Sequence, residues 1–297
     1  MDYFVQILVS GFTFSAMYAL AAVGLVLVWG AFNMLNMGHG IIMTLGAYFA
    51  LMWAELFGMP LVLAAPFAML CGGIVGAIVY FISAHWMIKQ RDFETTIIIA
   101  TFGLGMAMEA GLLKLLRELF HTSPYAQPLS MGADSFLVAT VPVSYQRIII
   151  WGAALFLILL LGMFLKRTKF GRAIRAVAQD RDAARLMGVQ VRNVYITVLA
   201  LASALAGVSG IMLSSFKEIH PLMGGALMLK AFIVIVLAGL GNLTGSLYAA
   251  LLIGMVEATV KVLIADKYGF TAILILVILA LIWKPAGIFG RSTVARQ

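Results

Sequence analysis

The chain has 297 residues, of which 63% are hydrophobic and only 11% are charged, and its formal net charge is +8. Soluble domains contain about 25% charged residues, so this composition excludes a soluble globular protein. The positive residues cluster in short loops and in the C-terminal tail, as the orientation signals of membrane proteins do, and therefore do not indicate a nucleic-acid partner. A single cysteine, Cys71, excludes a disulfide framework.

The length of the apolar runs predicts an all-α membrane protein. Several runs exceed the roughly 20 residues that a helix needs to cross a bilayer, whereas barrel strands are about ten residues long and alternate in polarity. We therefore predict that residues 1–297 form a single polytopic transmembrane bundle surrounded by membrane lipid. The N-terminus has no basic region ahead of its first apolar run, which favours a retained first helix over a cleaved signal peptide.

The apolar runs follow one another along the chain with few charged residues inside them. They cover residues 4–29, 41–57, 61–88, 95–116, 147–165, 194–216, 223–264 and 270–283. Glycines interrupt the run at 223–264, which therefore counts as one span or as two, so that about 8–9 spans are predicted.

Three charged segments predict which side of the membrane each loop faces. The loop at 89–94, the basic segment at 166–193 and the tail from residue 284 are separated by even numbers of crossings, so all three can lie on one side. Basic loops favour the cytoplasmic side. Residues 117–146, the longest stretch outside the apolar runs, then face the opposite side, and so does the N-terminus if the chain crosses on both sides of residues 30–40.

Two glycine-rich breaks interrupt the apolar pattern near opposite ends of the chain. Breaks at corresponding places in two halves are typical of inverted-repeat transporters, whose pathway lies at the breaks, where irregular backbone lines a cavity. We therefore predict an inverted repeat with broken or re-entrant segments and a translocation path lined by Asn36, His39, Gly40, Gly239, Gly241 and Asn242. The alternative is two ordinary interhelical turns, in which these residues serve turn geometry and His39 only holds a loop in place.

Nothing in the sequence indicates catalysis, a cofactor or a metal site. The four histidines (His39, His85, His121 and His220) are scattered and lack the spacing of metal ligands. No glycine-rich loop carries the lysine that would hold a nucleotide phosphate, so the chain is predicted not to be an enzyme and not to bind ATP itself.

Glu109, Glu257 and Lys261 fall inside apolar runs, where ionisable groups are costly and are functional by default. Glu257 and Lys261 lie at i and i+4, a spacing at which the two side chains can pair on one helix face. The alternative to a functional role is a self-neutralising pair near the membrane edge. For Glu109 the alternative is a polar contact between helices or a place near the aqueous boundary.

The basic segment at 166–193 holds eight of the twenty Lys and Arg residues. Residues 172–187 include no Pro or Gly, and Phe170, Ile174 and Val177 form an apolar stripe at i, i+4 and i+7. Gly188 is placed to end a helix with a left-handed cap. The pattern predicts a short amphipathic helix and a glycine turn, which either insert into a groove of a soluble partner or rest on anionic lipid.

Asp182-Ala183-Ala184, followed by Gly188, resembles the Glu-Ala-Ala…Gly loop of ATP-binding-cassette (ABC) importer permeases, with Asp in place of Glu. The wider chain resembles the branched-chain amino-acid ABC importer permease family, specifically the shorter, high-affinity-type permease subunit. Four blocks carry this resemblance: residues 19–24, 36–48, 170–188 and 230–257.

The resemblance implies a multi-pass permease subunit of the bacterial inner (cytoplasmic) membrane that moves branched-chain or other hydrophobic amino acids by alternating access. It implies a complex with a second related permease subunit, two ABC ATPase subunits and a periplasmic solute-binding protein. It assigns ATPase coupling to Phe170, Gly171, Arg172, Arg175, Asp182, Ala183, Ala184 and Gly188.

The chain departs from the family pattern at a few positions, and these departures leave the solute open. Gly38 stands where the family commonly has Ala, Thr244 where it often has Pro, and Glu109 near an uncharged position. Relatives of this permease type also move urea, amides or aromatic acids. A stand-alone secondary transporter coupled to an ion gradient is the alternative class.

Overall fold

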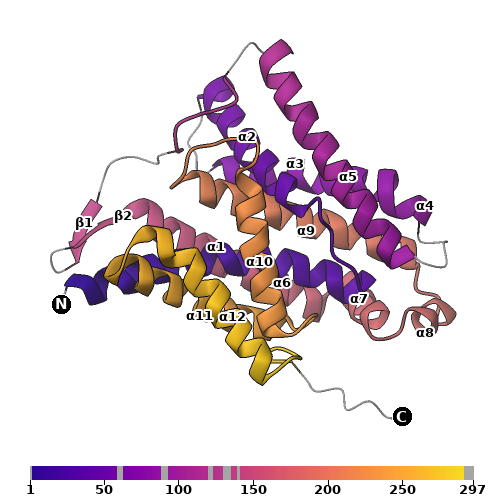
Figure 1. Ribbon diagram of the computed structural model, residues 1–297. Coiled ribbons are helices and arrows are strands. Elements are labelled where there is room, and N and C mark those ends of the chain that lie inside the picture. The colour runs from indigo at the N-terminus through magenta and orange to yellow at the C-terminus, as the bar shows by residue number, and fades with distance from the viewer. Residues whose placement is uncertain are drawn as a thin grey trace.

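The computed structural model describes residues 2–58, 63–87, 93–119, 123–129, 135–138 and 141–290. The long helices are α1 (Asp2–Phe32), α2 (His39–Phe57), α3 (Ala64–Val79), α5 (Phe93–Lys114), α6 (Tyr145–Arg167), α9 (Val191–Ser214), α10 (Met223–Ala238), α11 (Leu243–Leu263) and α12 (Gly269–Trp283) (Figure 1). The short elements are η2 (Tyr80–Ala84), α4 (His85–Met87), η3 (Leu115–Leu119), β1 (Ser135–Val138), β2 (Val141–Ser144), α7 (Lys169–Gln179), α8 (Arg181–Leu186) and η4 (Asp266–Tyr268). Residues 89–92 of the predicted basic loop, His121 and the tail from residue 291 lie outside the described residues.

The predicted helical membrane bundle is confirmed. Seven helices among the described residues are long and apolar enough to cross a membrane. Two further apolar helices lie beside them: α2, which has 19 residues, and α10, which has 16. The run at 223–264 is two helices, α10 and α11.

The stretch at 117–146 contains an antiparallel hairpin, β1–β2, which the expectation of an all-α chain did not include. The hairpin lies at one end of the bundle and α8 lies at the other (Figure 1). We refer to these ends as the hairpin end and the α8 end.

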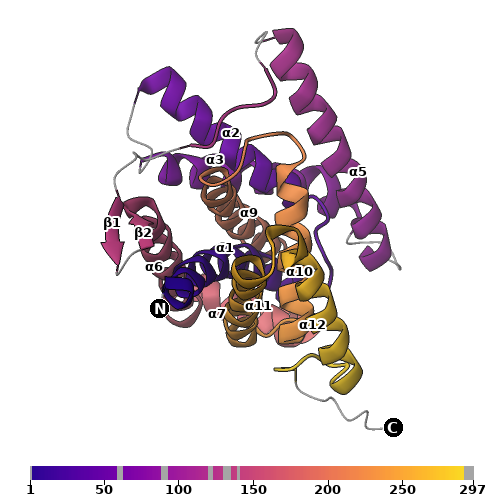
Figure 2. The same ribbon diagram turned by 60° about the vertical axis from the view of Figure 1, so that its left-hand side comes forward.

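Two helices, α1 and α9, form the centre of the bundle. Their apolar windows are 83% and 78% buried, whereas no other candidate span exceeds 39%. Figure 2 shows both helices in the middle, with the other long helices arranged around them. The two helices are antiparallel, because Gly24 of α1 faces Ala202 of α9 and the later Phe32 stacks on the earlier Tyr195.

The helix–helix contacts around α1 and α9 form two equivalent sets. The contacts of α1 with α11 and with α10 have counterparts in those of α9 with α3 and with α2. In the same way, α2 contacts α3, and α10 contacts α11. Exchanging α1, α2 and α3 with α9, α10 and α11 therefore maps one set of contacts onto the other. Because α1 and α9 are antiparallel, the two halves related by this exchange form an inverted repeat.

The two halves meet where α2 and α10 begin. A Cβ atom added to Gly224 would lie 1.9 Å from the backbone oxygen of Gly40, so the backbones of the two helices are in direct contact. The backbone N–H of Gly224 also donates a hydrogen bond to Thr44 Oγ1 at 3.0 Å. Small residues of this kind allow membrane helices to approach closely, since lipid supplies no hydrophobic drive for their association.

Replacing Gly224 by leucine is expected to separate α2 from α10. Overpacking of this kind typically costs about 1–3 kcal/mol, which should lower the melting temperature of the protein in detergent. The matched control is Gly225→Leu, since a Cβ atom at Gly225 meets nothing within 4 Å. Equal melting temperatures for the two variants would contradict the close packing described here.

Candidate functional site

The first break, residues 33–38, brings the chain back into the bundle before α2 begins. Asn33 adopts a left-handed conformation with φ 54°, which asparagine tolerates better than most residues. The Oδ1 atom of Asn36 then accepts a hydrogen bond from the Gly38 N–H at 3.0 Å. His39 Nε2 lies 3.3 Å from the backbone oxygen of Ala21. Ala21 precedes the end of α1 by eleven residues, or about 16 Å of helix, so α2 starts deep inside the bundle.

Two polar atoms at the first break are buried without a hydrogen-bond partner in the described part of the chain: Asn36 Nδ2 and His39 Nδ1. His39 is completely buried, and its ring packs against Gly24 of α1. This contact holds the start of α2 against α1, as expected if the histidine fixes a loop. Because Nδ1 of His39 has no hydrogen-bond partner among the described residues, this ring nitrogen is available for a further contact.

The second break is a tight turn between α10 and α11. Gly239 and Gly241 have φ values of 83° and 81°, which suit glycine. Asn242 caps α11: its Oδ1 accepts from the Gly245 N–H, and its Nδ2 donates to the Phe289 oxygen, both at 2.9 Å. The chain after α12 covers this turn, since Gly290 lies against Gly239.

The two predicted groups of path residues do not meet. Gly40 lies at the start of α10, against Gly224, whereas Gly239 follows the end of α10, fifteen residues or about 22 Å later. In the inverted repeat, α10 corresponds to α2, so the counterpart of the first break is residues 215–222 and not the glycine-rich turn. The assignment of a translocation path to these six residues stays a prediction.

A cavity of 210 Å³ adjoins the meeting point of the two halves. It is lined by Gly40 and Thr44 of α2, by Gly225 of α10 and by Glu109 of α5. Glu109, which is unusual as a charged residue inside an apolar run, therefore borders a cavity at the starts of α2 and α10. No contact among the described residues assigns Glu109 a partner.

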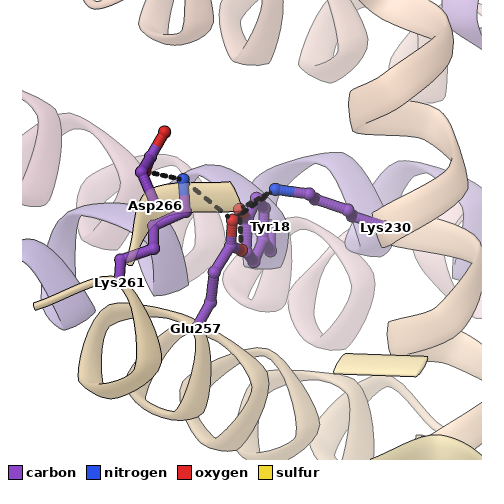
Figure 3. A network of polar contacts seen from close by, with 5 residues as sticks. All are labelled: Tyr18, Lys230, Glu257, Lys261 and Asp266. Carbon is purple, nitrogen blue, oxygen red and sulfur yellow. Dashed lines mark hydrogen bonds and ion pairs between the residues drawn. The ribbon is translucent and has the colours of Figure 1, made fainter. Parts of the chain in front are cut away.

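A buried ionic cluster joins α1, α10 and α11 (Figure 3). Glu257, whose side chain is 1% exposed, pairs through Oε1 with Lys230 at 2.6 Å and with Lys261 at 3.3 Å. The Tyr18 hydroxyl donates to the other Glu257 oxygen and accepts a hydrogen bond from Lys230 at 2.7 Å. Lys261 also pairs with Asp266 at 3.0 Å.

The sequence predicts only one contact of this cluster, the pair of Glu257 with Lys261. Lys230 is the closer partner of Glu257 and lies on a different helix. A lysine eight residues into an apolar run is the signal that could have marked it, since such a charge needs a partner inside the membrane. Tyr18 has no comparable signal.

The predicted coupling segment, residues 166–193, folds into two short helices, α7 and α8. Thr168 caps α7 by accepting a hydrogen bond from the Gly171 N–H, and Asp180 caps α8 by accepting from the N–H groups of Asp182 and Ala183. These are the side-chain caps that helix N-termini favour.

Gly188 ends α8 in the predicted left-handed conformation, with φ 82°. Its N–H donates to Arg185 O, and the N–H of Val189 donates to Ala184 O, each at 3.0 Å. This pair of bonds is the Schellman motif, in which a glycine closes a helix.

One face of the coupling segment packs on the bundle and the other faces away. Gly171, Ile174, Val177 and Ala184 are buried, while Phe170 is 53% exposed, so the apolar stripe of α7 excludes Phe170. The remaining predicted coupling residues Arg172, Arg175, Asp182, Ala183 and Gly188 are exposed. Arg175 donates a hydrogen bond to the Leu165 oxygen at the end of α6.

The tip of the segment is apolar and exposed. Leu186 and Met187, the last residues before the glycine cap, are 88% and 84% exposed. Two large apolar side chains therefore lie exposed at the tip of a basic segment, directly before the glycine that caps α8.

Known proteins match this chain along nearly its whole length. Residues 7–282 match the protein family described as "Branched-chain amino acid transport system / permease component". The chain is 28% identical to the high-affinity branched-chain amino acid transport system permease protein LivH of Escherichia coli, over 99% of this chain and 98% of that protein. It is 28% identical, with the same coverage, to the corresponding permease protein BraD of Pseudomonas aeruginosa.

A probable branched-chain amino acid transport permease protein LivH of Methanocaldococcus jannaschii is also 28% identical, over 96% of this chain and 92% of that protein. The match extends from the first helix to the last and includes both halves of the inverted repeat and the segment between them. The chain therefore belongs to the family of branched-chain amino acid transport system permease components.

Proposed function

We propose that this chain is the transmembrane permease subunit of an ABC importer for branched-chain or other hydrophobic amino acids. The observation that carries the proposal is the coupling segment: a capped helix pair with an exposed apolar tip, in a chain of this permease family. ATP is hydrolysed on separate ATPase subunits, whose cleft receives α8. The permease chain itself performs no chemistry.

The coupling segment is well placed to transmit force to the centre of the bundle. The segment α7–α8 is anchored on α6 and leads through Gly188 directly into α9, one of the two central helices. Because α9 contacts α1, α2 and α3, a displacement of α8 reaches both halves of the inverted repeat. Two halves that tilt against each other around a fixed site give alternating access.

The basic charges favour the α8 end as the cytoplasmic side. The hairpin end and the segment 215–222 then face the opposite side, where a solute-binding protein of the periplasm would deliver its cargo. With the α8 end in the cytoplasm and the hairpin end in the periplasm, the proposed location is the bacterial inner membrane.

The outer helices favour a membrane complex with a second, related permease. The apolar windows of α5 and α6 are each 22% buried and that of α12 is 17% buried, so most of their surface is available to lipid or to another permease chain. We propose a complex of these two permeases, two ATPases and the binding protein.

The direct test of the proposal is transport by the purified complex in proteoliposomes. We expect ATP-dependent uptake of leucine, isoleucine and valine that requires both the ATPases and the binding protein. Uptake driven by an ion gradient without ATPases would instead indicate a secondary transporter. Uptake of urea, amides or aromatic acids alone would keep the ABC mechanism and change the solute.

Placing charge on the apolar tip should prevent docking. In the double variant Leu186→Glu with Met187→Glu, two carboxylates replace the exposed apolar side chains, so we expect the ATPase no longer to co-purify with the permease. The control is Gln179→Glu with Gln190→Glu, which adds the same charge at exposed positions flanking α8. Loss of the ATPase in both double variants would mean that charge, and not the apolar tip, determines docking.

The glycine cap should matter for coupling rather than for membrane insertion. Gly188→Val forces a branched residue into a left-handed conformation, which costs about 1–2 kcal/mol, whereas Gly188→Asn keeps that conformation accessible. We expect the valine variant to hydrolyse ATP without solute-dependent stimulation and the asparagine variant to stay coupled. Coupled transport by the valine variant would show that the cap geometry is dispensable.

A further inference from the structure

The ionic cluster borders two hollows at the hairpin end, with volumes of 130 and 310 Å³. The two hollows share the lining residues Lys217, Ala226, Lys230, Glu257 and Lys261, so they adjoin each other. The proposed function leaves this cluster without a role.

The charges around the hollows do not balance. Lys217, Lys230, Lys261 and Lys267 line the larger hollow, against only two carboxylates, Glu257 and Asp266. The imbalance persists in the interior, where the two lysines that are 15% and 18% exposed share the single buried carboxylate of Glu257. Asp266 is 88% exposed and therefore compensates little of the buried charge. A cationic excess in a low-dielectric cavity attracts an anion.

Both buried lysines keep donor capacity. A lysine ammonium has three N–H donors. In the described part of the chain, the ammonium of Lys230 contacts oxygens of Tyr18 and Glu257 and lies over the Tyr18 ring at 5.0 Å. The ammonium of Lys261 contacts oxygens of Glu257 and Asp266 and lies over the Phe14 ring at 4.9 Å. Each ammonium therefore contacts two oxygens among the described residues and has a third N–H that could meet a further acceptor, and two such donors from neighbouring lysines suit the two oxygens of a carboxylate.

The smaller hollow adds an apolar wall to this charged end. Phe14 and Met17 of α1, Leu213 of α9 and Leu227 of α10 line it together with Tyr18 and the lysines. A ligand with a carboxylate at one end and a short aliphatic chain at the other would match both parts. Sites for small ligands commonly combine an apolar lining with a few placed polar groups.

The hollows lie at the end of the bundle opposite to the coupling segment. Lys217 follows the end of α9, and Asp266 and Lys267 lie in η4, between α11 and α12. Tyr18, which lines the smaller hollow, lies near the middle of α1, so the hollows extend from this end into the bundle.

We propose that this lysine-lined hollow is an outer binding site for the carboxylate of a hydrophobic amino acid, a proposal that rests on the proposed function. Lys230 and Lys261 bind the carboxylate, Asp266 accepts from the α-ammonium group, and the wall around Leu227 contacts the aliphatic side chain. Glu257 and Tyr18 are positioning residues that hold the two lysines in place.

Cysteine labelling tests the cavity without relying on transport. The experiment uses the double variant Cys71→Ala with Ala226→Cys, kept together with its ATPase in right-side-out membrane vesicles. We expect an anionic thiosulfonate reagent to label residue 226 about tenfold faster than a cationic one, because a cavity of one charge sign concentrates counter-ions. Lys217→Gln, at an exposed position that does not endanger the fold, should reduce this ratio.

Ligand protection tests the carboxylate. Leucine should slow the labelling of residue 226, and leucinol, which has a hydroxymethyl group in place of the carboxylate, should not. Equal labelling by both reagents, or equal protection by leucine and leucinol, would overturn the proposal. If the cluster is purely structural, labelling by the two reagents and protection by leucine and leucinol should both be equal, and Lys261→Gln should only lower the melting temperature.

Transport separates this proposal from the proposed function. In the reconstituted importer, Lys261→Gln should raise the KM for leucine about tenfold, the loss of roughly one charge-assisted hydrogen bond. The control Lys284→Gln removes the same charge at the far end of α12 and should leave KM unchanged. An unchanged KM in Lys261→Gln would refute the site. If the wild-type importer moves no amino acid, the proposed function fails, and the labelling ratio still decides whether the cavity binds anions.

Discussion

The structure depends on direct backbone contact between helices inside the membrane. Lipid is as apolar as the helices, so their association relies on close packing, which small residues permit. Gly224 against Gly40 joins the two halves, a Cβ atom on Gly210 would lie 1.8 Å from the Met43 oxygen, and Gly254 lies against Ser15 of α1. These contacts bring α2, α9 and α10 together and hold α11 against α1, and the contacts of the surrounding helices then follow the same inverted pattern.

The central packing also explains where polar groups are found. Because α2 and α10 are short and begin inside the bundle, the segments before them, residues 33–38 and 215–222, enter it as irregular backbone, which is tolerated when buried in protein. The ionic cluster lies beside the second of these segments, where two lysines and a glutamate would be costly unless paired. Polar residues thus gather at the starts of the short helices, while the coupling segment lies at the other end of α9.

Much of this architecture follows from local patterns in the sequence. Long apolar runs predict the spans, and the basic segment with its glycine predicts α7, α8 and the cap at Gly188, because capping and periodicity are local properties. Lys230 and Tyr18 could not be joined to Glu257 in this way, since they are far apart in the chain. The same limit explains why the first break suggested the glycine-rich turn as its counterpart: composition is similar, but only tertiary contacts show which helices correspond. Phe170 fits the stripe by spacing, yet the tighter fit of Gly171 against Leu165 turns it outward.

In the inverted repeat, the contact of α1 with α11 corresponds to the contact of α9 with α3. The ionic cluster strengthens only the first of these two helix contacts, which we call seams, against sliding. The seam between α1 and α11 is fastened by the hydrogen bond from Tyr18 to Glu257, and Lys230 ties α10 to the same carboxylate. The corresponding seam between α3 and α9 is lined by Gly72, Gly76 and Ser203, with no ion pair among the described residues. Displacing α3 along α9 therefore breaks no ion pair among the described residues, whereas displacing α11 along α1 breaks the hydrogen bond from Tyr18 to the buried Glu257 carboxylate. The helix pair α3 and α9 should therefore slide more easily than the pair α1 and α11. A single carboxylate, that of Glu257, makes the difference.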